Sequence, residues 1–202
     1  QVDRARFDHM LLTCAEDLGV TVRQETAVTD CIWADNTLRA IRLESSKSGS
    51  ETLDVDWVID ASGQRCWMGR QLKSIKNHAD LKSIATYAYF DHCGGLPGPL
   101  ARHAQYIVTV PEGWVWFIPN SDTRTSIGFV SKRTETLTEA DFLSCISSAL
   151  QGINIGSWAA KEGERLRVVR DWSYINQRPV GMNWVCAGDA VGFVDPILSG
   201  GV

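Results

Sequence analysis

Several features that mark other protein classes are missing from this 202-residue chain. No apolar run approaches the ~20 residues that a membrane-spanning helix needs, and no charged-then-apolar segment at the start resembles a secretion signal. Basic residues are not in excess, because the formal net charge is −4, which argues against nucleic acid as the main partner. We therefore expect no membrane span and no nucleic-acid partner.

The cysteines also lack the patterns of a metal or redox site. They lie far apart, without a CxxC pair or a Cys/His ligand spacing. Most stand among apolar neighbours, where a free cysteine behaves as a small hydrophobic residue. We expect free thiols, no metal and a cytoplasmic location. The six are Cys14, Cys31, Cys66, Cys93, Cys145 and Cys186.

The composition, 44% hydrophobic and 22% charged, is that of an ordinary globular protein with one large domain or two small ones. The chain begins at Gln1 without a methionine and ends in the glycine-rich sequence LSGGV. We therefore expect it to be a piece of a longer protein.

Helical spacing and strand alternation divide the chain into three parts. Apolar residues recur at helical spacing over residues 3–18, and Gly19 is placed to end that helix. Alternating, β-branched runs over residues 20–60 predict strands joined by hairpin turns. A short helix is expected over residues 66–72.

The middle of the chain predicts an antiparallel sheet. Its expected strands cover residues 83–90, 105–110, 114–118 and 125–130. Thr138 and Asp141 predict the start of a helix. Residues 165–175 predict one further strand, with charges alternating toward solvent. Helix and strand segments thus flank a meander of strands, which favours an α/β nucleotide-binding layer with an inserted sheet domain.

Two turns could carry ligand chemistry. A short apolar strand ends at Gly188 and Asp189, and ligands of open α/β sheets bind at such strand ends. A carboxylate there can accept hydrogen bonds from ribose or ribitol hydroxyls, while glycine allows close backbone approach. The sequence DASG over residues 60–63 ends another strand in the same way. Each also fits an ordinary turn or a helix cap.

Arg4 stands at the start of the first helix, where a positive charge opposes the helix dipole. A cofactor phosphate or ribose could compensate this charge, and so could plain exposure to solvent.

The sequence GWVWFIP at residues 113–119 places two tryptophans one residue apart. In a strand, Trp114, Trp116 and Ile118 share one face, and Val115 and Phe117 share the other. Both faces are apolar, so we expect the strand to be buried on both sides. It is either plain core or a wall beside a reaction site.

Three segments together resemble the FAD-dependent aromatic hydroxylase-like flavoproteins, in order and in spacing. They are residues 2–20 (VDRARFDHMLLTCAEDLGV), 58–64 (VIDASGQ) and 188–202 (GDAVGFVDPILSGGV). The resemblance covers nearly the whole chain, although the family's opening βαβ unit with G-x-G-x-x-G is absent. The resemblance implies a mixed α/β fold, namely a FAD-binding Rossmann-like fold of the aromatic hydroxylase type with an inserted antiparallel substrate domain.

Within that superfamily, Trp114, Trp116, Ile118 and Pro119 match the W-x-W-x-I-P signature of flavin-dependent halogenases. Tryptophan-type members carry a glutamate directly before the serine of the closing turn, whereas Leu198 stands there in this chain. The chain therefore resembles the phenol- and pyrrole-type enzymes more than the tryptophan type.

The resemblance also implies domain limits and site residues. Residues 1–75 and 165–202 would belong to the FAD-binding domain, and residues 76–164 to the substrate domain. The halide would lie at Ser199 and Gly200, although a serine or threonine is usual at the second position. The catalytic lysine of the family lies upstream of this chain, so no catalytic residue is assigned. The implied cofactor-binding residues are Arg4, Asp60, Ala61, Gly63, Gly188, Asp189, Pro196, Gly201 and Val202.

The implied reaction is the halogenation of an electron-rich phenol- or pyrrole-like substrate, free or tethered to a carrier protein. FADH2 from a separate flavin reductase would react with O2 to give a flavin C4a-hydroperoxide, which oxidises halide to hypohalous acid. The flavin would supply the redox chemistry and the protein would supply orientation and exclusion of water. The alternatives are a flavin monooxygenase or geranylgeranyl-reductase-like enzyme on the same fold, and a non-catalytic flavin-binding domain.

Overall fold

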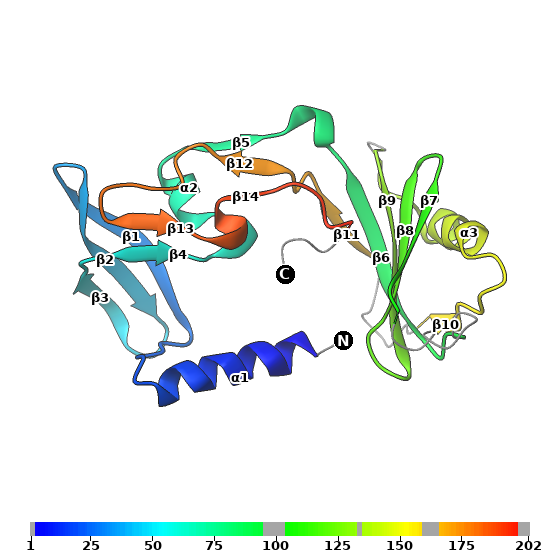
Figure 1. Ribbon diagram of the computed structural model, residues 1–202, viewed down its shortest axis with the longest axis horizontal. Helices are drawn as coiled ribbons and strands as arrows, with labels where there is room; N and C mark the ends of the chain where they lie inside the picture. Colours follow the sequence, from blue (N-terminus) through cyan, green and yellow to red (C-terminus); the bar gives the residue numbers. More distant parts are fainter. Residues whose placement is uncertain (1–2, 95–103, 133–134, 159–165, 198–202) are drawn as a thin grey trace. The chain divides into compact units, whose positions relative to one another are not determined.

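The computed structural model describes residues 3–94, 104–132, 135–158 and 166–197 (Figure 1). The chain forms two compact units. One, which we call the inserted unit, contains residues 78–173 together with the first three residues. The other, which we call the flanking unit, contains residues 4–77 and 174–202.

The flanking unit begins with helix α1 (Arg4–Asp17), so the helix expected over residues 3–18 is confirmed. Gly19, with φ of 91°, lies in the left-handed region and follows the helix end, as its position predicted. No residue of α1 is buried, and Phe7 and Leu11 on its expected apolar side are exposed. The periodicity thus predicted the helix, but its apolar side packs against no core among the described residues.

A three-stranded antiparallel sheet follows, formed by β1 (Thr26–Ala34), β2 (Thr37–Ser45) and β3 (Gly49–Asp54). Asp35 and Asn36 join the first two strands with φ of 49° and 64°, the left-handed pair that a tight hairpin turn requires. The sequence also predicted a strand at residues 20–23. This prediction is wrong, because these residues form no strand.

The remaining elements of the flanking unit come from both ends of the chain. Strand β4 (Val58–Asp60) pairs in parallel with β13 (Trp184–Cys186). The single-turn helix η1 (Gly63–Arg65) and helix α2 (Trp67–Gln71) follow β4, and the single-turn helix η3 (Gly188–Ala190) follows β13. Strands β5 (Ile75–Asn77), β12 (Tyr174–Asn176) and β14 (Gly192–Phe193) form a second sheet with β12 in the middle. The buried core cluster is Leu38, Met68, Trp184, Cys186 and Ala190.

One buried amide ties these pieces together. Asn183 Oδ1 accepts a hydrogen bond from Leu38 N at 2.9 Å, and its Nδ2 donates to Leu38 O at 2.7 Å and to Asp56 O at 2.9 Å. The side chain thereby links β2, the segment before β4 and the start of β13. All of its polar atoms have partners, which is what a buried amide requires.

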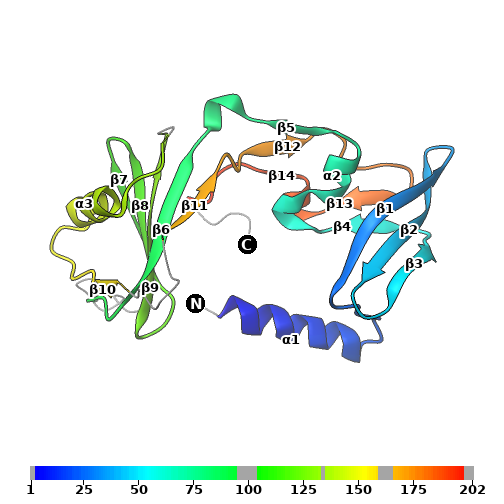
Figure 2. The same cartoon turned by 180° about the vertical axis from the view of Figure 1, so that it is seen from behind.

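The inserted unit is an antiparallel sheet covered by one helix (Figure 2). After η2 (Ala79–Leu81), the strands are β6 (Ile84–Asp91), β7 (Tyr106–Val110), β8 (Gly113–Pro119), β9 (Arg124–Ser131), β10 (Ser157–Trp158) and β11 (Arg167–Arg170). Their order is β10-β6-β9-β8-β7, and β11 also pairs with β6. The four central strands expected from the sequence are confirmed.

Helix α3 (Glu139–Ala149) packs on one face of this sheet. Thr138 caps it, since its Oγ1 accepts a hydrogen bond from Asp141 N at 3.2 Å, which confirms the predicted helix start. The buried core between helix and sheet contains Ala88, Phe90, Val115, Phe117, Ile127, Phe129, Phe142, Ile146 and Leu150.

The single strand expected over residues 165–175 is wrong. The segment forms two strands, because β11 pairs with β6 in the inserted unit whereas β12 pairs with β5 and β14 in the flanking unit. Asp171, with φ of 48°, interrupts the extended backbone between them. The bend follows from pairing with strands elsewhere in the chain, so the local pattern alone did not reveal it.

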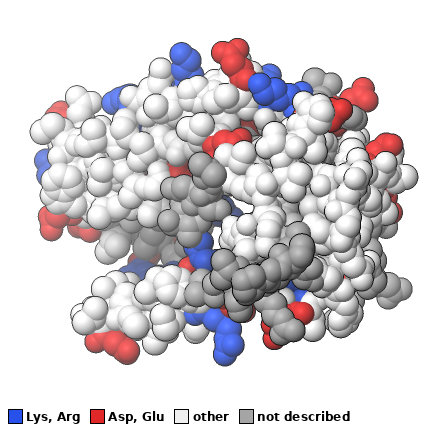
Figure 3. All heavy atoms as spheres, turned by 45° about the vertical axis from the view of Figure 1, so that its right-hand side comes forward, with Lys and Arg blue, Asp and Glu red and all other residues white. Residues whose placement is uncertain are grey.

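The described part of the chain contains no helix long and apolar enough to cross a membrane. Its residues also form no group of three or more His, Cys, Asp or Glu side chains that could hold a metal ion. On the face in Figure 3, basic and acidic side chains are scattered among uncharged ones.

We expect Asn183→Ala to lower the free energy of unfolding by roughly 2–4 kcal/mol, because it removes three hydrogen bonds and leaves the buried N–H and carbonyl of Leu38 without their partner. Urea unfolding of the complete protein measures this loss. Asn120→Ala is the matched control, since exposed Asn120 accepts one hydrogen bond, from Ser126 N at 3.1 Å. An equal loss in both variants would contradict the assigned role of Asn183.

Candidate functional site: two turns at one end of a parallel strand pair

The two sequence turns singled out as ligand sites lie side by side in the flanking unit. Because β4 and β13 run in parallel with Cys186 opposite Asp60, both strands deliver their following turns to the same edge. Ala187 N donates to Asp60 O at 2.8 Å and joins the two exits. Ligands of parallel α/β sheets bind at this carboxyl edge.

The Asp60 side chain faces the protein interior. It is 7% exposed, its Oδ1 accepts from Ser62 N at 2.9 Å, and its Oδ2 accepts from Met68 N at 2.7 Å. Both oxygens thus hold the DASG turn and the start of α2. Ala61 is exposed and Gly63 is half-buried, so both are more accessible than the buried Asp60.

The backbone of both turns is open to a ligand. Gly63 and Gly188 have φ of 63° and 58°, and a Cβ built at either position meets no atom within 4 Å. The positive φ favours glycine at both sites. The carboxylate of half-buried Asp189 makes no hydrogen bond or ion pair with the described residues. An acceptor beside exposed glycine backbone fits a ligand that carries hydroxyl groups.

Three buried side chains that the sequence did not single out support these turns. Tyr174 OH donates to Asp189 O at 2.6 Å, and Cys66 Sγ contacts the same oxygen at 3.5 Å. Asn176 Nδ2 contacts Ala190 O at 3.5 Å, and Asn176 Oδ1 accepts from Ser74 Oγ at 2.6 Å. The signal that the sequence offered for these supporting residues was Tyr174 and Asn176, which lie two positions apart on one face of β12.

Burial sets the protonation of the groups under the turns. It raises the pKa of the Cys66 thiol and of the Tyr174 hydroxyl, so both remain protonated donors near neutral pH. Burial, with a further contribution from the Asp60 charge, raises the pKa of Cys186 to about 11. These thiols are therefore structural groups, because a protonated and buried thiol is a poor nucleophile.

The other expected cofactor residues are placed differently. Arg4 lies on α1 and pairs with Asp8, with Nε and Oδ1 3.1 Å apart, and both side chains are more than half exposed. Pro196 is half-buried after β14. Ser199, Gly200, Gly201 and Val202, with Leu198, lie outside the described residues. The structure thus brings together Asp60, Ala61, Gly63, Gly188 and Asp189.

The tryptophan strand β8 separates two unlike environments. Val115 and Phe117 are fully buried against α3, whereas Trp114, Trp116 and Ile118 on the opposite face are only half-buried. The expectation of burial on both sides is therefore wrong, because α3 covers one face only. Trp116 Nε1 donates to Ser126 Oγ at 3.0 Å, so the indole is held in place.

Aromatic rings continue along that half-buried face. The ring centroids of Trp114 and Trp116 are 5.8 Å apart, and those of Trp116 and Tyr87 are 5.7 Å apart. Tyr89 extends the row, and the guanidinium carbons of Arg124 and Arg167 lie 4.5 and 5.3 Å from its ring centroid. We call this row of rings the aromatic face; its rim carries positive charge.

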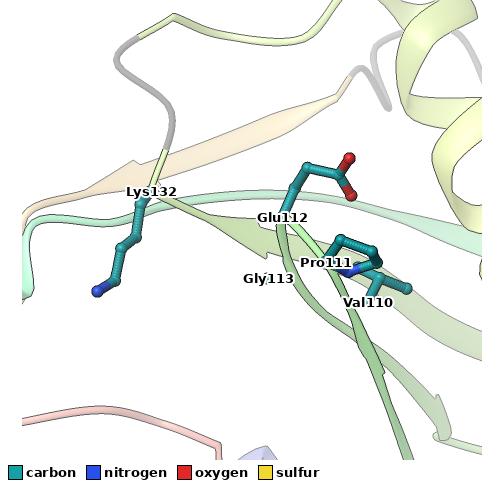
Figure 4. Close-up of a pocket in the computed structure, with 5 residues that line it drawn as sticks. All are labelled: Val110, Pro111, Glu112, Gly113 and Lys132. Carbon is teal, nitrogen blue, oxygen red and sulfur yellow. The ribbon is translucent and has the colours of Figure 1, made fainter.

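A separate open hollow of about 560 Å³ lies at the turn between β7 and β8 (Figure 4). The Lys132 amine and the Glu112 carboxylate point away from each other. The remaining lining residues are Val110, Pro111 and Gly113. No second polar group among these lining residues converges on the Lys132 amine, so we assign the hollow no part in the site.

Room for the Trp116 indole depends on Gly128 of the neighbouring strand. A Cβ at Gly128 would lie 2.2 Å from Trp116 Cζ2, so we expect Gly128→Ala to cost roughly 1–3 kcal/mol of unfolding free energy. Denaturant unfolding measures this cost. Trp116→Phe should be less harmful in the Gly128→Ala background than in the wild type. If the losses of the two single variants simply add up in the double variant, crowding between the new Cβ and the Trp116 indole is not the cause.

The raised pKa of Cys186 predicts a loss of stability at alkaline pH. Below its ordinary value of 9.0 the thiol is protonated in both states, and between 9.0 and about 11 only the unfolded state ionises. Stability should therefore fall as pH rises through this window. The fall between about pH 8 and about pH 10.5 should be smaller in Cys186→Ala, measured by unfolding midpoints. The exposed Cys14→Ala variant should behave as the wild type does.

Comparison with known proteins assigns the family. A family model described as tryptophan halogenase matches residues 1–202. Flavin-dependent halogenase armH3 of Armillaria mellea is 33% identical over all of this chain and 45% of its own length. The 1H-pyrrole-2-carbonyl-(peptidyl-carrier protein) chlorinase of Pseudomonas fluorescens is 27% identical over all of this chain and 46% of its own length. The chain therefore spans about half the length of the curated relatives that it matches.

Solved structures agree on the fold. The myxobacterial chondrochloren halogenase CndH, described as a new variant of FAD-dependent halogenases, superposes with a TM-score of 0.85. It is 29% identical, and the match covers all of this chain and 48% of that chain. The fold is accordingly the mixed α/β FAD-binding fold of the aromatic hydroxylase type with an inserted antiparallel sheet. The chain belongs to the tryptophan halogenase family of flavin-dependent enzymes.

Proposed function

We propose that the complete protein is a flavin-dependent halogenase that uses reduced FAD, O2 and halide to halogenate an electron-rich aromatic substrate. The observation that carries the proposal is the pair of open turns at the carboxyl edge of β4 and β13, with the Asp189 carboxylate unpaired among the described residues. Family membership supplies the reaction class.

In this proposal, each residue of the two turns has a specific part in holding FAD. Asp189 would accept a hydrogen bond from a ribitol hydroxyl, and Gly188, Ala61 and Gly63 would let the cofactor approach the backbone. Asp60 would act indirectly, by holding the DASG turn. Bound reduced FAD supplies the oxidising chemistry with O2, and the protein supplies orientation and exclusion of water. Arg4, Pro196, Gly201 and Val202 remain predicted cofactor contacts.

The domain assignment is part of the same proposal. The predicted limits are residues 1–75 and 165–202 for the FAD-binding domain and residues 76–164 for the substrate domain, whereas β11 pairs with β6 and so lies with the inserted sheet. Trp114 and Trp116, with Ile118 and Pro119, would form an unreactive wall that helps to keep the substrate away from the flavin. Their half-burial and the fixed Trp116 indole support a wall over a reacting role. Halide would lie at Ser199 and Gly200.

For the substrate, we propose a phenol- or pyrrole-like ring, free or tethered to a carrier protein. The relative named as a pyrrole-2-carbonyl carrier-protein chlorinase supports this class. A relative from Chondromyces crocatus named tryptophan 2-halogenase is equally identical, at 27%, so overall identity does not separate the two. The proposal therefore depends on Leu198, which replaces the glutamate of the tryptophan type.

We further propose that a separate NAD(P)H-dependent flavin reductase supplies reduced FAD. All six cysteines are free thiols, which supports action in a reducing compartment such as the cytoplasm.

We expect the complete protein, given reduced FAD, O2 and bromide or chloride, to halogenate a simple phenol or pyrrole. Mass spectrometry of the product distinguishes the outcomes.

Asp189→Ala should weaken FAD binding roughly tenfold or more, because a charge-assisted hydrogen bond is lost. Exposed Asp122→Ala is the control and should bind FAD as the wild type does.

Two outcomes would contradict the proposal. Hydroxylated or reduced product alone would assign the protein to the monooxygenases or reductases of this fold. A bound flavin spectrum without turnover of any substrate would instead indicate a non-catalytic flavin-binding domain.

A further inference from the structure

The carbonyl oxygen of Asp189 is held by side chains from two other segments. Tyr174 OH donates to it at 2.6 Å from strand β12. Cys66 Sγ approaches it at 3.5 Å from the junction between η1 and α2. The two side chains are 7% and 1% exposed, so water does not replace either donor.

The backbone itself offers no donor for this oxygen among the described residues. Helix η3 is a single turn, in which Val191 N bonds to Gly188 O and Ala190 N bonds to Ala187 O. The chain then enters β14, which pairs with β12. The last carbonyls of so short a helix therefore need side-chain donors, because a buried carbonyl without a partner is costly.

Cys66 reaches this oxygen from a constrained backbone. Its φ is 43°, a left-handed conformation that side chains other than glycine, Asn and Asp rarely adopt. Cys66 N donates to Gly63 O at 3.0 Å, which fixes the end of the DASG turn. Such strain persists where surrounding contacts determine the conformation. The thiol thus connects the DASG turn to the GDA turn.

We propose that Tyr174 and Cys66 are positioning residues that set the direction of Asp189 toward FAD. The proposal rests on the proposed function, since Asp189 is taken there as a cofactor ligand. Neither residue touches FAD in this account. Both act on the peptide that carries the Asp189 side chain, and losing either donor lets that peptide rotate.

Tyr174→Phe tests this, because it keeps the ring and removes only the hydroxyl. In the complete protein we expect the Kd for FAD, measured by quenching of flavin fluorescence, to rise roughly five- to tenfold. The visible spectrum of bound flavin should also shift, which a loss of stability alone would not cause. Tyr106→Phe is the matched control, since its half-buried ring in the inserted unit makes no side-chain hydrogen bond among the described residues.

Cys66 variants test the shared oxygen. Cys66→Ser keeps a donor and should change the Kd by about twofold or less, whereas Cys66→Ala should raise it. Because both donors serve one acceptor, Tyr174→Phe combined with Cys66→Ala should raise the Kd by more than the product of the single effects.

The outcomes separate this proposal from the proposed function. If Asp189→Ala weakens FAD binding and Tyr174→Phe does not, the positioning role is overturned and the proposed function stands. Equal effects of Tyr174→Phe and Tyr106→Phe would also overturn it. If the complete protein binds no FAD, the proposed function fails and the positioning role fails with it.

Discussion

The parallel pairing of β4 with β13 is the contact on which the candidate site depends. It joins residues more than a hundred positions apart in the chain, and it delivers two glycine-containing turns to one edge. The buried Asp60 carboxylate secures this arrangement through two backbone amides, and Asn183 anchors the start of β13 to β2. Without the pairing, each turn would be an ordinary bend.

Around that pair, polar groups are used to fix backbone and are not left free for chemistry. Asp60, Asn176, Asn183 and Tyr174 are all buried and all satisfied by specific partners. Such networks are costly when incomplete, so they hold one arrangement of the turns. Asp189 differs from them because its backbone carbonyl is held, whereas its carboxylate makes no hydrogen bond or ion pair with the described residues. A fixed peptide that carries an available carboxylate is what a ligand site needs.

Much of this fold follows from local pattern. Alternation predicted the four strands of residues 83–130 in the inserted unit and the hairpin turns of residues 20–60, and Thr138 predicted the start of α3. The turns at Gly63 and Gly188 were singled out because glycine and acid follow apolar strands. Local pattern could not show that residues 165–175 change sheet at Asp171, because the change follows from pairing with β6 on one side of the bend and with β5 on the other.

The rest depended on contacts between distant segments. Tyr174 and Cys66 meet at Asp189 O only after the chain has folded, so spacing in the sequence gave no indication of it. Burial of the tryptophan strand was misjudged for a similar reason. Apolar side chains on both faces of β8 predicted two covers, whereas α3 supplies one.

The chain enters and leaves the inserted unit at neighbouring points. His78 N donates to Ser173 O at 3.0 Å on one side of the boundary, and Asn77 pairs with Tyr174 on the other. A segment whose two ends are this close can be lengthened, shortened or exchanged without disturbing the strands that receive it. Related proteins could therefore diversify the residues between these points while the paired turns stay unchanged. Because the two ends of the inserted unit lie close together, its residues can change in evolution independently of those of the flanking unit.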